Sequence, residues 1–187
     1  MNLKTVLSYC DRGIREARLR FVETYNYLGT TISRDLTWSA NIQRQVKKAW
    51  KRIFHLRKLN EFSVSKRIKT LFYSSVVESV FTFGVAVWGG NVLEYDLKPV
   101  KQVVRCATRI IGAPLSKLED IYKGKANKLR DKIVADRQHP MNCYFPMLPS
   151  GHRFRQIENH TERLRRSLVP QAISLYNNNN RLLQEMK

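Results

Sequence analysis

Apolar residues recur at steps of three and four in the segment from residue 38 to residue 59. This spacing places them on one face of an α-helix. We expect the helix to begin near Ser39, because a serine oxygen can accept a hydrogen bond from a free backbone N–H of the first turn. The residues expected to face the core are Ile42, Val46, Ala49, Trp50, Ile53 and Leu56.

The same spacing predicts a second helix between residue 65 and Gly84 and a third over residues 96–111. The third helix is followed by Gly112 and then Pro114, a typical helix-stop pattern. In the second helix, the residues expected to point inward are Ile68, Leu71, Phe72, Val76 and Val80.

Two further helices are predicted in the C-terminal half. The sequence Ser116-Lys117-Leu118-Glu119 has the pattern of a capping box, which would open a fourth helix that ends near residue 135. Pro170 suits the first turn of a last short helix. We expect this helix to end near Tyr176, with the polar tract at residues 177–180 ending the ordered structure.

The N-terminal region has a different pattern. Residues 4–9, 19–25 and 27–32 are short β-prone runs, and Gly29 interrupts the last of them. The fold class that we predict is therefore mainly α (α+β), a short N-terminal β-hairpin element followed by an antiparallel helical bundle. The predicted divisions are a β element at 1–36, a helical domain at 37–90, a downstream helical region at 91–177 with a proline-rich connector at 139–153, and a disordered tail at 178–187.

The net charge of the chain indicates the kind of partner that it binds. The 187-residue chain has a formal net charge of +19, an excess that points to an anionic partner, with nucleic acid as the first candidate. Between Arg44 and Lys69 the only acid is Glu61. A nearly pure cationic face is unusual for a solvated helix, where mixed signs are favoured. The residues predicted to contact nucleic acid are Arg44, Lys47, Lys48, Lys51, Arg52, Lys58, Lys66, Arg67 and Lys69.

Residues for catalysis or metal binding form no recognisable set. The adjacent acids Glu119 and Asp120 fall in the first turn of a predicted helix, where the helix dipole favours them for structural reasons. The histidines near Cys143 lack the spacing of a tight zinc-ligand pair, and no His-x-Asp iron motif occurs. We therefore expect no cofactor, no metal and no enzymatic activity.

The three scattered cysteines are typical of a reducing compartment. The N-terminus has no signal-peptide pattern, and no apolar run is long enough to cross a bilayer. These features predict an intracellular protein, nuclear or cytoplasmic, with no membrane partner.

Six sequence blocks, taken in order, resemble a known family. They are "YNYLGTTISRDLTWSANI", "KKAWKRIFHLRKL", "LFYSSVVESVFTFGVAVWGG", "VVRCATRIIGAPLSKLEDIY", "HPMNCYFPMLPSGHRFR" and "RLRRSLVPQAISLYN". Together they are similar to the C-terminal third of the reverse transcriptase of non-LTR retrotransposons (LINEs), over about residues 2–177. Asn2, Lys4 and Thr5 match that family's N-x-K-T pattern.

The resemblance implies roles for several segments. Tyr27, Leu28 and Gly29 would form the primer-grip hairpin, residues 39–88 would form the thumb that holds the template–primer duplex, and residues from 96 onward would form the downstream region. The family's aromatic-x-Asp-Asp motif is absent from this sequence, and without those carboxylates a pair of magnesium ions cannot be held for nucleotidyl transfer. We therefore expect a catalytically incomplete fragment that retains backbone binding to RNA or an RNA–DNA hybrid.

Two alternatives remain open. In the first, the segments "VFTFGVAVW" and "CYFPML" dock a protein partner, and the chain is a repurposed interaction module. The second follows from the label "alkylated DNA repair protein AlkB homologue 8, N-terminal", which is also applied to segments that resemble residues 27–88. That label would bring dioxygenase or methyltransferase activity, for which the sequence lacks the iron ligands.

Overall fold

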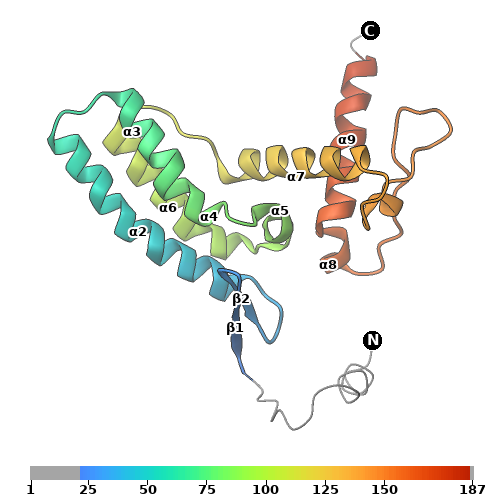
Figure 1. Cartoon of the computed structure of the whole chain (residues 1–187), viewed down its shortest axis with the longest axis horizontal. Helices are drawn as coiled ribbons and strands as arrows, with labels where there is room; N and C mark the ends of the chain where they lie inside the picture. The colour runs from blue at the N-terminus through green and yellow to red at the C-terminus, as the bar shows by residue number, and fades with distance from the viewer. Residues whose placement is uncertain (1–21, 186–187) are drawn as a thin grey trace.

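The structure is a computed structural model that describes residues 22–185, with side chains described through residue 181. A β-hairpin leads into a bundle of helices, and a single helix connects this bundle to a second helical unit (Figure 1). The predicted mainly α fold with an N-terminal hairpin is confirmed. The predicted β run at residues 4–9 and the N-x-K-T residues Asn2, Lys4 and Thr5 lie outside the described residues.

The hairpin consists of β1 (Thr24–Tyr27) and β2 (Thr30–Ser33), which pair antiparallel with Tyr27 opposite Thr30. Its two-residue turn has positive φ angles at Leu28 (46°) and Gly29 (86°). Two such residues define a type I′ turn, whose twist matches that of the flanking strands. Glycine adopts this conformation at little steric cost, which explains why the aromatic run breaks there.

The long helix α2 (Ser39–Glu61) buries the predicted apolar face, with one exception. Trp50 is 36% exposed, so its predicted place in the core is wrong. The predicted cap is wrong too, because the N-cap residue is Trp38 and no side chain caps the helix. The Ser39 hydroxyl instead donates to the Asp96 carboxylate at 2.7 Å.

The chain then returns along α2 through α3 (Lys66–Phe72), the π-helical segment η1 (Tyr73–Glu78) and α4 (Ser79–Phe81). The predicted inward face is wrong at Ile68 and Leu71, which are more than half exposed, whereas Phe72 packs against the core as predicted. In α3 the buried position is taken by Lys69 instead. The residues that reach the core are Tyr73, Val77 and Phe81.

Gly84, with a φ of 62°, breaks the return segment, and α5 (Val85–Trp88) and η2 (Gly89–Asn91) follow. Among the described residues, no single helix is long and apolar enough to cross a membrane. One bent pair, 66–81 with 85–91, passes that test by length and composition. In this fold its apolar residues include Val77, Val85 and Trp88, which are buried in the core.

Helix α6 (Glu94–Ile111) runs in the same direction as α2 and packs along it (Figure 1). Ser39 bonds to Asp96 at the beginning of the pair, and the Arg57 guanidinium lies 3.8 Å from the Cys106 sulfur nearer its end. As predicted, the helix stops at Gly112, which has a φ of 72°. The first hydrophobic cluster extends from Ile42 to Leu118, so α6 shares its core with α2 although it begins after the predicted boundary at residue 91.

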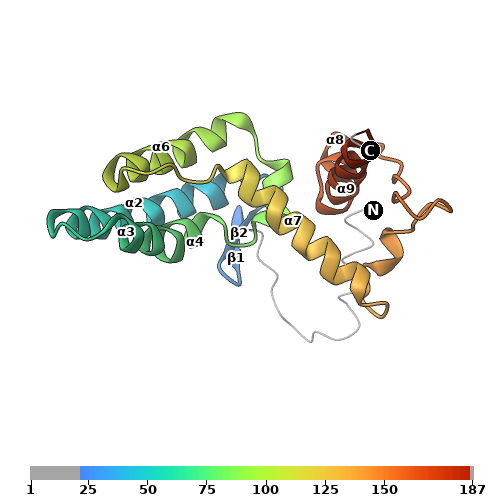
Figure 2. The same cartoon turned by 90° about the horizontal axis from the view of Figure 1, so that it is seen from above.

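Helix α7 (Leu118–Ala135) crosses from this bundle to the second unit (Figures 1 and 2). Its N-cap is Lys117, without a side-chain cap, so the predicted capping box does not form. Glu119 instead lies 3.6 Å from the ammonium group of Lys101 on α6. The second unit contains η3 (Asn142–Tyr144), α8 (Glu162–Arg165) and α9 (Leu168–Glu185) around a smaller cluster formed by Ile133, Phe145, Phe154, Ala172 and Ile173.

Helix α9 continues past the point where we predicted disorder, since residues 178–185 are helical. Two asparagines of the polar tract explain part of the difference. Asn177 accepts from the backbone N–H of Phe154 and donates to its carbonyl, both at 2.9 Å. Asn180 donates to the carbonyl of His152. The polar tract therefore binds the preceding loop to α9 and does not end the ordered structure.

Candidate nucleic-acid interface

The outer face of α2 carries a row of lysines that we call the cationic crest: Lys47, Lys48, Lys51 and Lys58. All four are exposed. Lys58 is partly neutralised by Glu61, whose carboxylate lies 2.8 Å away. Among the side chains that the structure describes, through residue 181, those of Lys47, Lys48 and Lys51 form no ion pair and no hydrogen bond. Their charge is therefore available to an anionic partner.

Two arginines predicted to bind nucleic acid also hold the fold together. The guanidinium of Arg44 donates to the Thr31 hydroxyl at 3.2 Å and to the Asn26 amide oxygen, which ties α2 to the hairpin. Arg52 donates to the backbone carbonyl of Val76 in η1. A guanidinium has five N–H donors, so these bonds leave donors over for a ligand.

Of the other residues predicted to contact nucleic acid, some lie at the surface and one is buried. Lys66 and Arg67 are exposed in the first turn of α3. Lys69 is only 8% exposed, and its ammonium group donates to the Asn60 side chain at 2.8 Å. Lys69 thus lies in the joint between α2 and α3, away from the surface that the other cations form.

We predict that Lys69→Met leaves nucleic-acid affinity unchanged. A buried charge can be replaced by an apolar side chain of similar volume at little cost, and the exposed Asn60 can bond to water instead. The free energy of unfolding should therefore stay within about 1 kcal/mol of the wild type. Filter binding and urea denaturation measure the two quantities, with Lys66→Met as the surface control. An affinity loss that is larger for Lys69→Met than for Lys66→Met would place Lys69 in the interface after all.

Beside the crest, the hairpin turn and the α2–α4 pair enclose a hollow of about 400 Å³, the hairpin groove. It contains Leu28 and Gly29 of the predicted primer grip together with the cations Lys48 and Arg52. Tyr27 is exposed on β1 and does not line the groove. Thus two of the three predicted primer-grip residues line the same groove as two of the predicted basic residues. The remaining lining residues are Gln45, Ser79, Val80 and Phe83.

Phe83 is the aromatic residue of this groove, and it was not among the residues predicted to bind nucleic acid. It is 52% exposed, and it is followed by the left-handed Gly84. A Cβ atom at Gly29 would lie 3.8 Å from the Phe83 ring, so the turn and the ring are in close proximity. An exposed aromatic ring just before a helix-breaking glycine was the available signal. The groove therefore combines positive charge with an exposed ring and a leucine.

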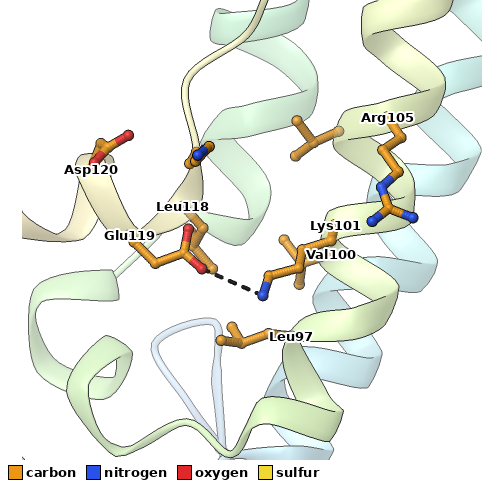
Figure 3. Close-up of a pocket in the computed structure, with 9 residues that line it drawn as sticks. Leu97, Val100, Lys101, Arg105, Leu118, Glu119 and Asp120 are labelled. Atoms are coloured by element: carbon orange, nitrogen blue, oxygen red, sulfur yellow. Dashed lines mark ion pairs between the residues drawn. The ribbon is translucent and has the colours of Figure 1, made fainter.

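A larger pocket of about 540 Å³ lies between α6 and the first turn of α7 (Figure 3). Leu97, Val100 and Leu118 give it an apolar wall. The ammonium group of Lys101 lies 2.8 Å from Glu94 and 3.6 Å from Glu119, and these carboxylates neutralise it. Hydrogen bonding from Lys101 lowers the pKa of Glu94. Lys101 therefore links α6 to the first turn of α7 and has no charge left for an anion. Arg105 and Lys117 also line the pocket and form no ion pair among the described side chains.

Some titratable groups of the helical bundle have shifted pKa values. Desolvation raises the pKa of Glu78 in η1, and the nearby Lys125 partly opposes the shift. Burial also raises the pKa of Tyr73. Among the side chains of residues 22–181, no group of three or more His, Cys, Asp or Glu could hold a metal ion.

Comparison with known proteins gives one partial match. A family model described as "Alkylated DNA repair protein alkB homolog 8, N-terminal" matches residues 38–79, which run from the N-cap of α2 to the first residue of α4. The matched segment contains the whole cationic crest but less than a quarter of the chain. No curated protein and no solved structure matches the chain significantly.

Proposed function

We propose that this protein binds the sugar–phosphate backbone of RNA or an RNA–DNA hybrid through the cationic crest and the hairpin groove. The observation that carries the proposal is the trio Lys47, Lys48 and Lys51, exposed on one helix face and without acidic partners among the described residues. Lysines that neutralise phosphates release condensed counterions, and this release favours binding. The cost of keeping like charges together on one helix is then offset in the complex.

The geometry of the crest favours an extended backbone over a single phosphate. From Lys47 to Lys58 the helix rises by about 16 Å at 1.5 Å per residue. Nucleotides of one strand rise by about 3.4 Å each in a B-form duplex, so this length is comparable to about five nucleotides. A-form helices are recognised mainly by shape and through phosphate and 2′-hydroxyl contacts. A cationic helix beside an open groove suits that kind of recognition.

The sequence resemblance to LINE reverse transcriptases supports the same function. In this proposal the hairpin at Leu28 and Gly29 corresponds to the primer grip, and α2 with the returning α3–α4 segment corresponds to the thumb. The two lie together in the hairpin groove, as the corresponding parts of a polymerase would have to do to hold one duplex. We further propose that the chain binds nucleic acid without catalysis, inside the cell.

A second candidate function follows from the family-model match at residues 38–79. In this alternative the segment belongs to a protein that acts in the repair of alkylated DNA, as the name of that family states. Iron-dependent turnover of 2-oxoglutarate by the purified chain would support it.

A third candidate, protein docking, is favoured by the exposed Phe83 and Val87 of "VFTFGVAVW" and the exposed Tyr144 and Met147 of "CYFPML".

Binding of a fluorescein-labelled RNA–DNA hybrid to the full chain tests the proposal. We expect saturable binding. Unlabelled hybrid should compete better than a DNA duplex of the same sequence, because in this proposal the crest recognises the shape of an A-form backbone. An absence of binding at about 50 mM salt, where phosphate contacts are strong, would contradict the proposal. Turnover of 2-oxoglutarate in the same preparation would favour the second candidate.

A further inference from the structure

A second basic groove lies on the other edge of α2, where this helix meets α6. We call it the Trp50 groove; its volume is about 580 Å³. Successive residues of a helix are about 100° apart, so Trp50 and Arg57 project from α2 on the opposite edge from Lys48 and Arg52. In the view of Figure 2, α6 and the α3–α4 segment follow different edges of α2. The full lining is Trp50, Arg57, Gln102, Arg105, Cys106, Arg109 and Ile110.

The charge of this groove is entirely positive. Arg57, Arg105 and Arg109 line it, and no acidic residue does. Over the part of the chain that the structure describes, none of the three arginines forms an ion pair. The only hydrogen bond recorded there for the Arg57 side chain is a weak one to the Cys106 sulfur at 3.8 Å. Three guanidinium groups therefore surround one hollow without a carboxylate to neutralise them.

Structural roles account for only part of this arrangement. Arg109 lies in the last turn of α6, where a cation is stabilised by the helix dipole. Arg105 is four residues away on the same face, and like charges at that spacing destabilise a helix. Trp50 adds an aromatic ring to this lining, and its side chain remains 36% exposed.

An exposed indole beside unpaired guanidinium groups is the combination that binds single-stranded nucleic acid. Bases of any sequence stack on an aromatic ring, and arginines bind the phosphates between them. In a duplex the base faces are already stacked, so the ring has no access to them. The chemistry of this groove is thus distinct from that of the lysine crest, which needs no ring.

We propose that the Trp50 groove binds single-stranded RNA, with a base stacked on Trp50 and neighbouring phosphates bound by Arg57, Arg105 and Arg109. The groove is separate from the hairpin groove, and the crest lies between them on the outer face of α2. A nucleic acid with a duplex part and a single-stranded part could therefore contact both edges of the helix. The inference does not depend on duplex binding by the crest.

The test uses the full chain and an unstructured, fluorescein-labelled oligouridylate. Trp50→Ala should weaken binding by about tenfold or more, because the stacking of one base is lost. Trp50→Phe keeps an aromatic ring and should lose clearly less affinity. Arg105→Ala with Arg109→Ala should also weaken binding and reduce its salt dependence. As a second measurement, 5-bromouracil in the oligonucleotide should form a photo-crosslink that maps to Trp50.

The paired variants separate stacking from folding. All are compared by thermal melting, and the Phe variant controls for loss of the ring's packing. The inference would be overturned if Trp50→Ala bound the oligonucleotide with wild-type affinity, or if the Ala and Phe variants lost affinity equally. Crosslinks confined to the hairpin groove would overturn it as well. Charge reversal at Lys47, Lys48 and Lys51 that leaves hybrid binding intact would overturn the proposed function and leave this inference standing.

Discussion

Replacing Lys47, Lys48 and Lys51 with glutamate is expected to lower the affinity for an RNA–DNA hybrid by about 100-fold or more at low salt. The substitutions remove three exposed cations without ion-pair partners in the described chain and put three anions against the phosphates. Because none of the three side chains makes a hydrogen bond there, the fold should be retained. Fluorescence anisotropy measures the affinity, and circular dichroism checks the helix content.

A control with the same change in charge is available on α7. Lys123, Lys128 and Lys132 are also exposed and form no ion pairs with the side chains described through residue 181. Replacing them with glutamate changes the net charge by the same amount. If the crest is the binding surface, the α7 variant should retain most of the affinity. Equal losses in the two variants would show that total charge, and not the crest, determines binding. Arg52 is left unchanged because it bonds to Val76.

Trp88→Ala is expected to lower the free energy of unfolding by about 3–5 kcal/mol, the usual cost of truncating a large buried aromatic side chain. Trp88 is 1% exposed, and its indole N–H donates to the Phe83 carbonyl at 2.8 Å. It therefore holds the chain on both sides of Gly84 and keeps Phe83 beside the hairpin turn. Urea denaturation gives the stability, and hybrid binding below the unfolding transition reports the groove.

Trp50→Ala is the matched control, because it removes the same side chain from a position that is 36% exposed. Its stability loss should be clearly smaller than that of Trp88→Ala, since less apolar surface is returned to water. Similar losses at the two positions would mean that the core does not lie where the structure places it.

The sequence predicted the helices better than the way they pack. The step of three and four residues correctly identified Ile42, Val46, Ala49, Ile53 and Leu56 as core, because α2 is a regular helix. The same rule failed at Ile68 and Leu71, because Lys69 takes the buried position in α3 and Tyr73 follows it four residues later. A periodicity argument follows apolar residues and has no means of detecting a lysine on the inward face.

Polar contacts between residues distant in the chain also could not be predicted from the sequence. Lys69 looked like one more surface cation, but its bond to Asn60 across the α2–α3 joint buries it. Ser39 looked like a helix cap, but its hydroxyl donates a hydrogen bond to the carboxylate of Asp96, far along the chain. The candidate site shows the same limit. Charge alone identified the crest, whereas the hairpin groove and the Trp50 groove depend on helices that are distant in sequence.

The salt dependence of hybrid binding tests the central claim most directly. If about four cations of the crest and α3 neutralise phosphates, the logarithm of the binding constant should fall linearly with the logarithm of the salt concentration, with a slope of about −3 to −4. The triple glutamate variant should have a much shallower slope, because most of these contacts are removed. A wild-type slope near zero, or no binding at about 50 mM salt, would contradict a function based on phosphate recognition by α2.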